Sequence, residues 1–227
     1  NTKKVAADLL AWTGLSKYGD HVERLMYNSV LNSSSRKTGM SQYHQPLGIG
    51  AAKVFATPYD TFWCCTCSGV EAFSEIQNDI FYKTDRGIRL NLFVPSVLEW
   101  EEAGATLVLR GDFPNDDRVS ITLGIAKPKH FAIELRTAYW LAGPLEIDIN
   151  GKRTEAALDM KGIATLDRLW HNDDKIEVRL PMSIHTTPMP DDPDIVAVMY
   201  GPVVLAALSE GAMIVDDPTS RVRRTSA

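Results

Sequence analysis

The sequence predicts an α+β protein in which helices come first and an antiparallel β-sandwich follows. Up to about residue 80 the apolar residues recur at helical spacing, and beyond it they alternate with polar residues, as in strands that bury one face. Hydrophobic residues make up 44% of the 227 residues, which is enough for a sizeable core. We expect a helical part at 1–79, a β-sandwich at 80–215 and a tail at 216–227.

Charge and hydropathy exclude two classes of function. With 24 basic and 29 acidic residues the net charge is −5, so no basic excess is available for nucleic acid. No run approaches 18 consecutive apolar residues, so we expect no membrane span. The chain opens at Asn1 without an apolar signal core, and we interpret it as cut from a longer protein. The compartment stays open, because a signal peptide would lie upstream.

Two helices are expected near the N-terminus. Val5, Leu9 and Trp12 share one helical face, and Gly14 ends that helix. Asp20 is a candidate N-cap for the second helix. The apolar stripe of this second helix consists of Val22, Leu25, Met26 and Val30. The two helices together predict an antiparallel pair.

A loop region and a third helix follow. Residues 32–63 are rich in Ser, Gly and Pro and are too many for a simple connection, so a functional loop is expected. Ser68 and Glu71 have the spacing of a capping box, and Val70, Phe73 and Ile76 give the third helix an apolar face. This helix is therefore expected to start directly after a cluster of cysteines.

Alternating segments separated by turn residues predict the sandwich. The turns between them carry Asp85-Arg86-Gly87, Pro114-Asn115-Asp116-Asp117, Asn150-Gly151 and Asn172-Asp173-Asp174, as hairpins require. The expected strands are 88–94, 106–110, 119–125, 131–136, 145–149, 175–180, 195–200 and 203–208.

The three cysteines gather in Cys64-Cys65-Thr66-Cys67, just before the expected third helix. A helix N-terminus favours thiolate, so a reactive or metal-bound cysteine is physically reasonable. Two alternatives stay open: small apolar fillers beneath Trp63, or a Cys64–Cys67 disulfide of the C-x-x-C type. A complete structural zinc site is not expected, because the sequence has no second C-x-x-C and no paired histidines.

The spacing of the other polar residues gives weaker evidence for a functional role. Glu23 beside the apolar stripe reads as a solvated residue or a partner of Arg24. Among the five histidines only His44, next to Tyr43 in an aromatic loop, lies where a polar ligand would be met. Tyr43 and His44 are therefore the candidate substrate-binding residues.

Several blocks of the sequence resemble the β-L-arabinofuranosidase-like glycoside hydrolases of family 127. The blocks are 18–31, 45–48, 57–65, Glu71, Phe73, 80–82, 150–151, Trp170, 174–181 and 200–202. The blocks containing Glu23-Arg24 and Cys64-Cys65 are the most specific of them.

The resemblance implies the C-terminal helices of an (α/α)6 barrel followed by the sandwich, and retaining hydrolysis of β-L-arabinofuranosides or related sugars. It implies that Cys64 is a zinc-bound nucleophile, that Cys65 is a second zinc ligand, and that Glu23 belongs to the active site by binding sugar or supporting it. Zinc would keep the sulfur as thiolate at neutral pH.

The resemblance also implies what this sequence lacks. The family's remaining zinc ligands, in an E-x-C motif, and its acid/base glutamate would lie upstream of Asn1, so the chain alone is expected to be inactive. Cys67 stands where family members have Gly or Pro. The expected partners are a carbohydrate and either the missing N-terminal barrel segment or a second copy. The alternative function is a non-catalytic carbohydrate-binding or structural β-sandwich module, with Trp140 or Trp170 as sugar platforms.

Overall fold

The computed structural model describes residues 1–44, 53–61 and 63–206. They form two compact units, which are described separately. The first contains Asn1–Asn28 and Glu75–Leu205, and the second contains Ser29–Ser74 and Ala206–Ala227 as far as these are described. The predicted tail at 216–227 and the last residues of the predicted sandwich lie outside the described residues.

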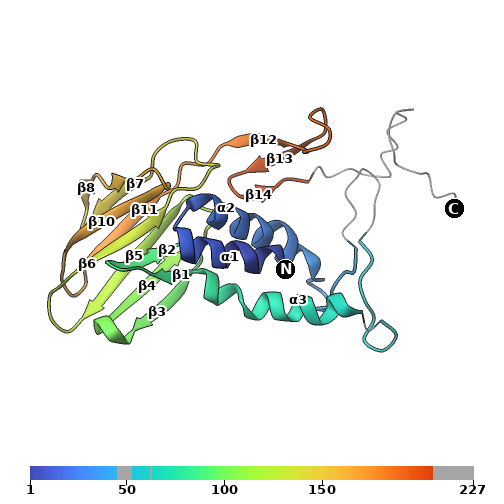
Figure 1. Cartoon of the computed structure of the whole chain (residues 1–227), viewed down its shortest axis with the longest axis horizontal. Coiled ribbons are helices and arrows are strands. Elements are labelled where there is room, and N and C mark those ends of the chain that lie inside the picture. The colour runs from blue at the N-terminus through green and yellow to red at the C-terminus, as the bar shows by residue number, and fades with distance from the viewer. Residues whose placement is uncertain (45–52, 62, 207–227) are drawn as a thin grey trace. The chain divides into compact units, whose positions relative to one another are not determined.

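The first unit begins with the two predicted helices, α1 (Thr2–Thr13) and α2 (Ser16–Leu25), which lie side by side (Figure 1). Gly14 ends α1 in the left-handed conformation, with a φ of 70°, as predicted. Asp20 is not an N-cap, because α2 starts four residues earlier, at Ser16. No described helix is long and apolar enough to cross a membrane.

The predicted apolar face of α1 is wrong in part. Leu10 and Ala6 are the buried apolar residues of the helix, whereas Val5 is 57% and Trp12 is 78% exposed. Lys3 lies on the buried side because its ammonium pairs with the buried carboxylate of Asp79. Sequence periodicity does not reveal this ion pair, because it counts Lys3 as a polar residue of the exposed side.

A turn of π-helix (Met26–Val30) and a 3-10 turn (Leu31–Ser33) follow α2. The third helix, α3 (Cys64–Ser74), starts at the cysteines themselves and is followed by the 3-10 turn Ile76–Asp79. Ser68 is therefore inside α3, and its hydroxyl donates to the carbonyl of Cys64 instead of capping the helix. The predicted apolar face is also wrong for Val70, which is 69% exposed.

The rest of the first unit is built from three sheets. The five-stranded sheet has the order β1 (Phe81–Lys83), β2 (Gly87–Leu90), β6 (Lys129–Arg136), β10 (Ile163–Trp170) and β9 (Ala157–Leu158). The six-stranded sheet has the order β3 (Ser96–Trp100), β4 (Ala105–Gly111), β5 (Arg118–Ile125), β11 (Lys175–Arg179), β7 (Glu146–Ile149) and β8 (Lys152–Thr154). The three-stranded sheet consists of β12 (Ile184–Pro188), β13 (Val196–Tyr200) and β14 (Val203–Val204).

The two larger sheets share one hydrophobic core, which confirms mixed helix and sheet content with the strands following the helices. Phe131 of β6 meets Trp100 of β3 edge to face, with ring centroids 5.3 Å apart. Asn150 and Gly151 form the predicted two-residue hairpin between β7 and β8, both with positive φ. The structure differs from the prediction in two respects. Strands β1, β3, β8, β9, β10 and β12 were not among the expected strands, and β2 pairs with β6 in parallel.

Arg136, at the end of β6, joins the sandwich to α2. Its side chain is fully buried, and Nη1 donates to Asp20 Oδ1 at 2.5 Å. Nη2 lies 2.7 Å from Glu23 Oε1, and Nε donates to the carbonyl of Asn91 at 2.9 Å. Trp140 completes the cluster by donating its indole N–H to Glu23 Oε2 at 2.7 Å. We call these five residues, Asp20, Glu23, Asn91, Arg136 and Trp140, the Arg136 cluster.

The cluster requires a residue without a side chain on α2. A Cβ added at Gly19 would lie 2.2 Å from Asn91 Oδ1 and 2.5 Å from Arg136 Cδ. Both neighbours are fully buried, so neither can move into solvent. Gly19 therefore allows the helix backbone to approach the sandwich closely.

We predict that Gly19→Ala destabilises the chain. Alanine would gain about 1 kcal/mol of helix propensity, but overpacking against buried groups costs about 1–3 kcal/mol or more, so the clash outweighs the gain. Urea denaturation measures the free energy of unfolding. Gly143→Ala is the control, because a Cβ there meets nothing within 4 Å. A Gly19→Ala chain more stable than the wild type would contradict the close approach.

Candidate functional site

The cysteine cluster occupies the first turn of α3 in the second unit. Cys64 and Cys67 are exposed, Cys65 is half-buried, and all three are free thiols. The Sγ atoms of Cys64 and Cys65 lie 3.8 Å apart. The alternative in which the cysteines are buried fillers does not hold among the described residues, and no disulfide closes the C-x-x-C.

Electrostatics at this turn act in two directions. The unpaired N–H groups of a helix N-terminus favour thiolate. The contact with the Cys64 thiol raises the pKa of Cys65, with a smaller contribution from desolvation. Two neighbouring thiols therefore resist carrying two negative charges unless a cation lies between them.

The geometry of the thiol pair fits a shared zinc ion. Zn–S bonds are about 2.3 Å, so two sulfurs at a tetrahedral angle lie about 3.8 Å apart. This agrees with the 3.8 Å between Cys64 Sγ and Cys65 Sγ. Within the described ranges no group of three or more His, Cys, Asp or Glu residues could hold a metal ion, so the two thiols do not form a complete metal site with other described residues.

The two candidate substrate-binding residues contact each other, and Tyr43 also contacts Trp63, the residue directly before Cys64. Tyr43 meets His44 with ring centroids 4.4 Å apart and meets Trp63 with centroids 5.5 Å apart, both edge to face. Tyr43 is 45% exposed. The preceding segment contacts α3, since a Cβ at Gly69 would lie 3.6 Å from Ser41 Cβ. Trp63, which directly precedes Cys64, was not a candidate from the sequence, although an aromatic pair before the cysteines was a usable signal.

Glu23 lies in the first unit and is fully buried. The interpretation of a solvated helix residue is therefore wrong. Burial raises the pKa of Glu23 and of Asp20, and the Arg136 guanidinium only partly opposes this. Sequence reasoning missed Arg136, although a charged residue directly after the strand segment 131–135 was the available signal.

The tryptophans suggested as sugar platforms are buried. Trp170 is 0% and Trp140 is 3% exposed, and the indole of Trp170 donates to the carbonyl of Phe131. Neither ring can stack on a sugar from solvent.

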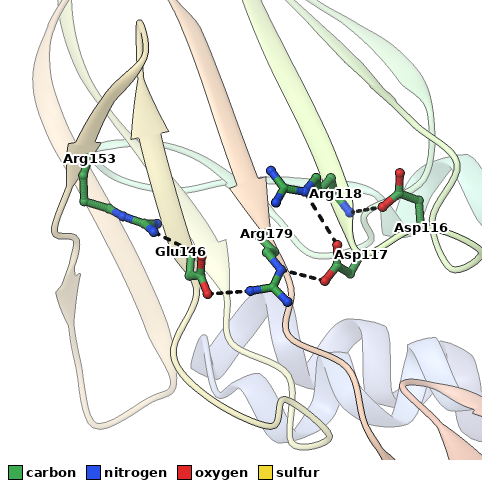
Figure 2. Close-up of polar contacts among 6 residues, drawn as sticks. All are labelled: Asp116, Asp117, Arg118, Glu146, Arg153 and Arg179. Carbon is green, nitrogen blue, oxygen red and sulfur yellow. Dashed lines mark hydrogen bonds and ion pairs between the residues drawn. The ribbon is translucent and has the colours of Figure 1, made fainter.

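A charged hollow of about 320 Å³ lies on the outer face of the six-stranded sheet, with no aromatic side chain in its lining. Figure 2 shows Arg179 bridging Asp117 and Glu146, at 2.7 and 2.8 Å, and Arg153 also reaching Glu146. The contact with Arg153 is the main reason that the pKa of Glu146 is lowered. Charges that pair with one another in this way are typical of a solvated sheet face.

Two family models match the chain. The catalytic domain of the GH127 β-L-arabinofuranosidases matches residues 1–78, and the middle domain of the same enzymes matches residues 87–182. The chain belongs to the GH127 family. No curated protein matches it.

Solved structures agree with this assignment. A structure described as a glycoside hydrolase is 26% identical with a TM-score of 0.74, and the match covers 89% of this chain and 36% of that one. A GH127 β-L-arabinofuranosidase from Geobacillus stearothermophilus is 22% identical, covering 89% and 34%, and a GH127 β-arabinofuranosidase is 18% identical, covering 89% and 35%. Both have a TM-score of 0.74 and show the same fold. The chain thus spans about a third of the length of these GH127 structures.

The raised pKa of Glu23 gives a testable pH dependence. Above its ordinary value of 4.5, the unfolded chain releases the Glu23 proton more readily than the folded chain does. The free energy of unfolding therefore falls as pH rises from this value through the folded pKa. We expect Glu23→Gln to flatten this fall, measured by urea denaturation at a series of pH values.

The control for this experiment is Glu155→Gln, which removes an exposed carboxylate. An identical slope for the wild type and Glu23→Gln would show that the buried carboxyl group titrates as it does in water.

Proposed function

We propose that this chain forms part of a retaining β-L-arabinofuranosidase in which Cys64 is the nucleophile and Cys64 and Cys65 are ligands of a zinc ion. The observation that carries the proposal is the exposed thiol pair, 3.8 Å apart at the start of α3, within the part matched by the GH127 catalytic domain. Membership of a glycoside hydrolase family supports a carbohydrate as substrate.

In the proposed reaction the Cys64 thiolate attacks the anomeric carbon of the terminal sugar. A C–S bond forms while the C–O bond to the leaving group breaks, and the leaving oxygen takes a proton from a general acid. Water then attacks the same carbon, a base takes its proton, and Cys64 leaves as thiolate. Two inversions give net retention of configuration.

The residues of this chain would prepare the nucleophile. Cys65 would fix the position of Cys64 through their shared ion, and the α3 N-terminus would favour the negative charge on sulfur. Bound zinc would supply the positive charge that keeps both thiols deprotonated. Without that charge, the contact with the Cys64 thiol raises the pKa of Cys65.

Tyr43 and His44 are proposed to contact the sugar, with Trp63 supporting Tyr43 from its edge. Glu23 is proposed to support the site and not to contact the sugar, because Arg136 and Trp140 already engage both of its oxygens. The helices would form the C-terminal part of an (α/α)6 barrel, with a division near residue 79 or 80 between barrel and sandwich. The end of the catalytic-domain match at 78 and the start of the middle-domain match at 87 support this division.

The remaining zinc ligands and the acid/base glutamate are proposed to come from the rest of the catalytic domain. The chain spans about a third of the solved relatives, and two thiols cannot complete a tetrahedral site. We therefore propose that the 227 residues alone do not hydrolyse glycosides.

The metal site can be tested in the chain alone. Co²⁺ replaces zinc and absorbs strongly when bound by thiolates, so added Co²⁺ should give a thiolate charge-transfer band. Cys64→Ser and Cys65→Ser should each weaken it markedly, and Cys67→Ser should leave it unchanged. A band that depends on Cys67 but not on Cys65 would contradict the ligand assignment.

The nucleophile can be tested in a polypeptide that also supplies the rest of the catalytic domain. With an aryl β-L-arabinofuranoside as substrate, Cys64→Ser should reduce kcat by about 100-fold or more, whereas Cys67→Ser should keep it. An unchanged rate in Cys64→Ser would refute the nucleophile.

The exposed apolar residues of α1 support the proposal that the chain associates with another polypeptide segment. Val5 and Trp12 are largely exposed, and such residues on one helix favour association with another segment. The partner is proposed to be the preceding barrel segment or, in its absence, a second copy. Light scattering of the chain alone should show self-association that Trp12→Glu reduces, and a strictly monomeric wild type would contradict this.

A further inference from the structure

We propose that Cys67 is a resolving cysteine, which forms a reversible disulfide with Cys64 when a hydroperoxide oxidises the Cys64 thiolate. The formation of this bond does not depend on the proposed function. The effect of the disulfide on activity does rest on the proposed function, because the disulfide would remove the proposed nucleophile, which is also one of the proposed metal ligands.

Helix geometry selects the pair. Residues three apart in an α-helix share a face, with Cα atoms about 5 Å apart, inside the disulfide range of about 4.4–6.8 Å. Cys64 and Cys67 have this spacing at the start of α3, and both are exposed. The bond can therefore form without moving the helix backbone.

The other two pairs are unfavourable, even though the Cys64 and Cys65 sulfurs lie 3.8 Å apart. Adjacent Cα atoms are about 3.8 Å apart, which is below the disulfide range. Cys65 and Cys67 point about 200° apart around the helix axis, so their Cβ atoms diverge. Cys65 is also the least exposed of the three.

The chemistry needs one hydroperoxide and no other oxidant. The Cys64 thiolate attacks the O–O bond, giving a sulfenic acid and releasing an alkoxide or hydroxide. The Cys67 thiol then attacks that sulfur, the S–S bond forms, and the oxygen leaves as water. A dithiol reductant reverses the bond by exchange and is itself oxidised to a disulfide. Without Cys67 the sulfenic acid would be open to further, irreversible oxidation.

Intact mass and thiol alkylation test the proposal on the full chain, reduced and freed of metal by a chelator. After one equivalent of hydrogen peroxide the wild type should lose the mass of two hydrogens and keep one alkylatable thiol, Cys65. Dithiothreitol should restore all three. Cys65→Ser, the matched control, should still lose two hydrogens. Cys67→Ser should instead gain one oxygen, and a second equivalent of hydrogen peroxide should add oxygen that dithiothreitol does not remove.

Two results would overturn the proposal. Loss of two hydrogens in Cys67→Ser would assign the disulfide to Cys64 and Cys65. Absence of that loss in Cys65→Ser would show that Cys65 forms the bond in place of Cys64 or Cys67. Failure of the proposed function would show instead as a missing Co²⁺ band or as hydrolysis independent of Cys64, with these mass changes intact.

Discussion

The contact of Arg136 with Asp20 and Glu23 is the interaction on which the first unit depends. A fully buried guanidinium at the end of a sandwich strand holds two carboxylates of one helix. Removing one partner of a buried charge pair leaves the other unpaired, at a cost of about 3–5 kcal/mol. The same contact explains why Gly19 faces the sandwich without a side chain and why the Trp140 indole is directed inward.

This constraint also explains which parts of the structure the sequence could predict. Local signals were sufficient for the end of α1 at Gly14 and for the hairpin at Asn150-Gly151, because in both the backbone conformation depends on the residue itself. The positions of other side chains depend on residues that are far away in the sequence. Asp20 looked like a cap because Arg136, the group that binds it, is 116 residues away. Glu23 looked like a surface residue for the same reason.

Around the cysteines, the sequence predicted the family but not all of the local structure. The Cys64-Cys65 block indicated both the family and the thiol pair, and the family models support the former. The start of α3 was misplaced by four residues, because Ser68 and Glu71 imitate a capping box inside a helix. Trp63 was missed, because its contact with Tyr43 spans twenty residues of loop.

The central claim is that Cys64 and Cys65 bind the same zinc ion. Zinc-edge X-ray absorption of the zinc-loaded chain measures it most directly, because sulfur ligands at about 2.3 Å are distinct from nitrogen or oxygen ligands at about 2.0–2.2 Å. We expect two sulfur atoms per zinc in the wild type and in Cys67→Ser, and one in Cys65→Ser. A zinc environment of nitrogen and oxygen alone would contradict the account.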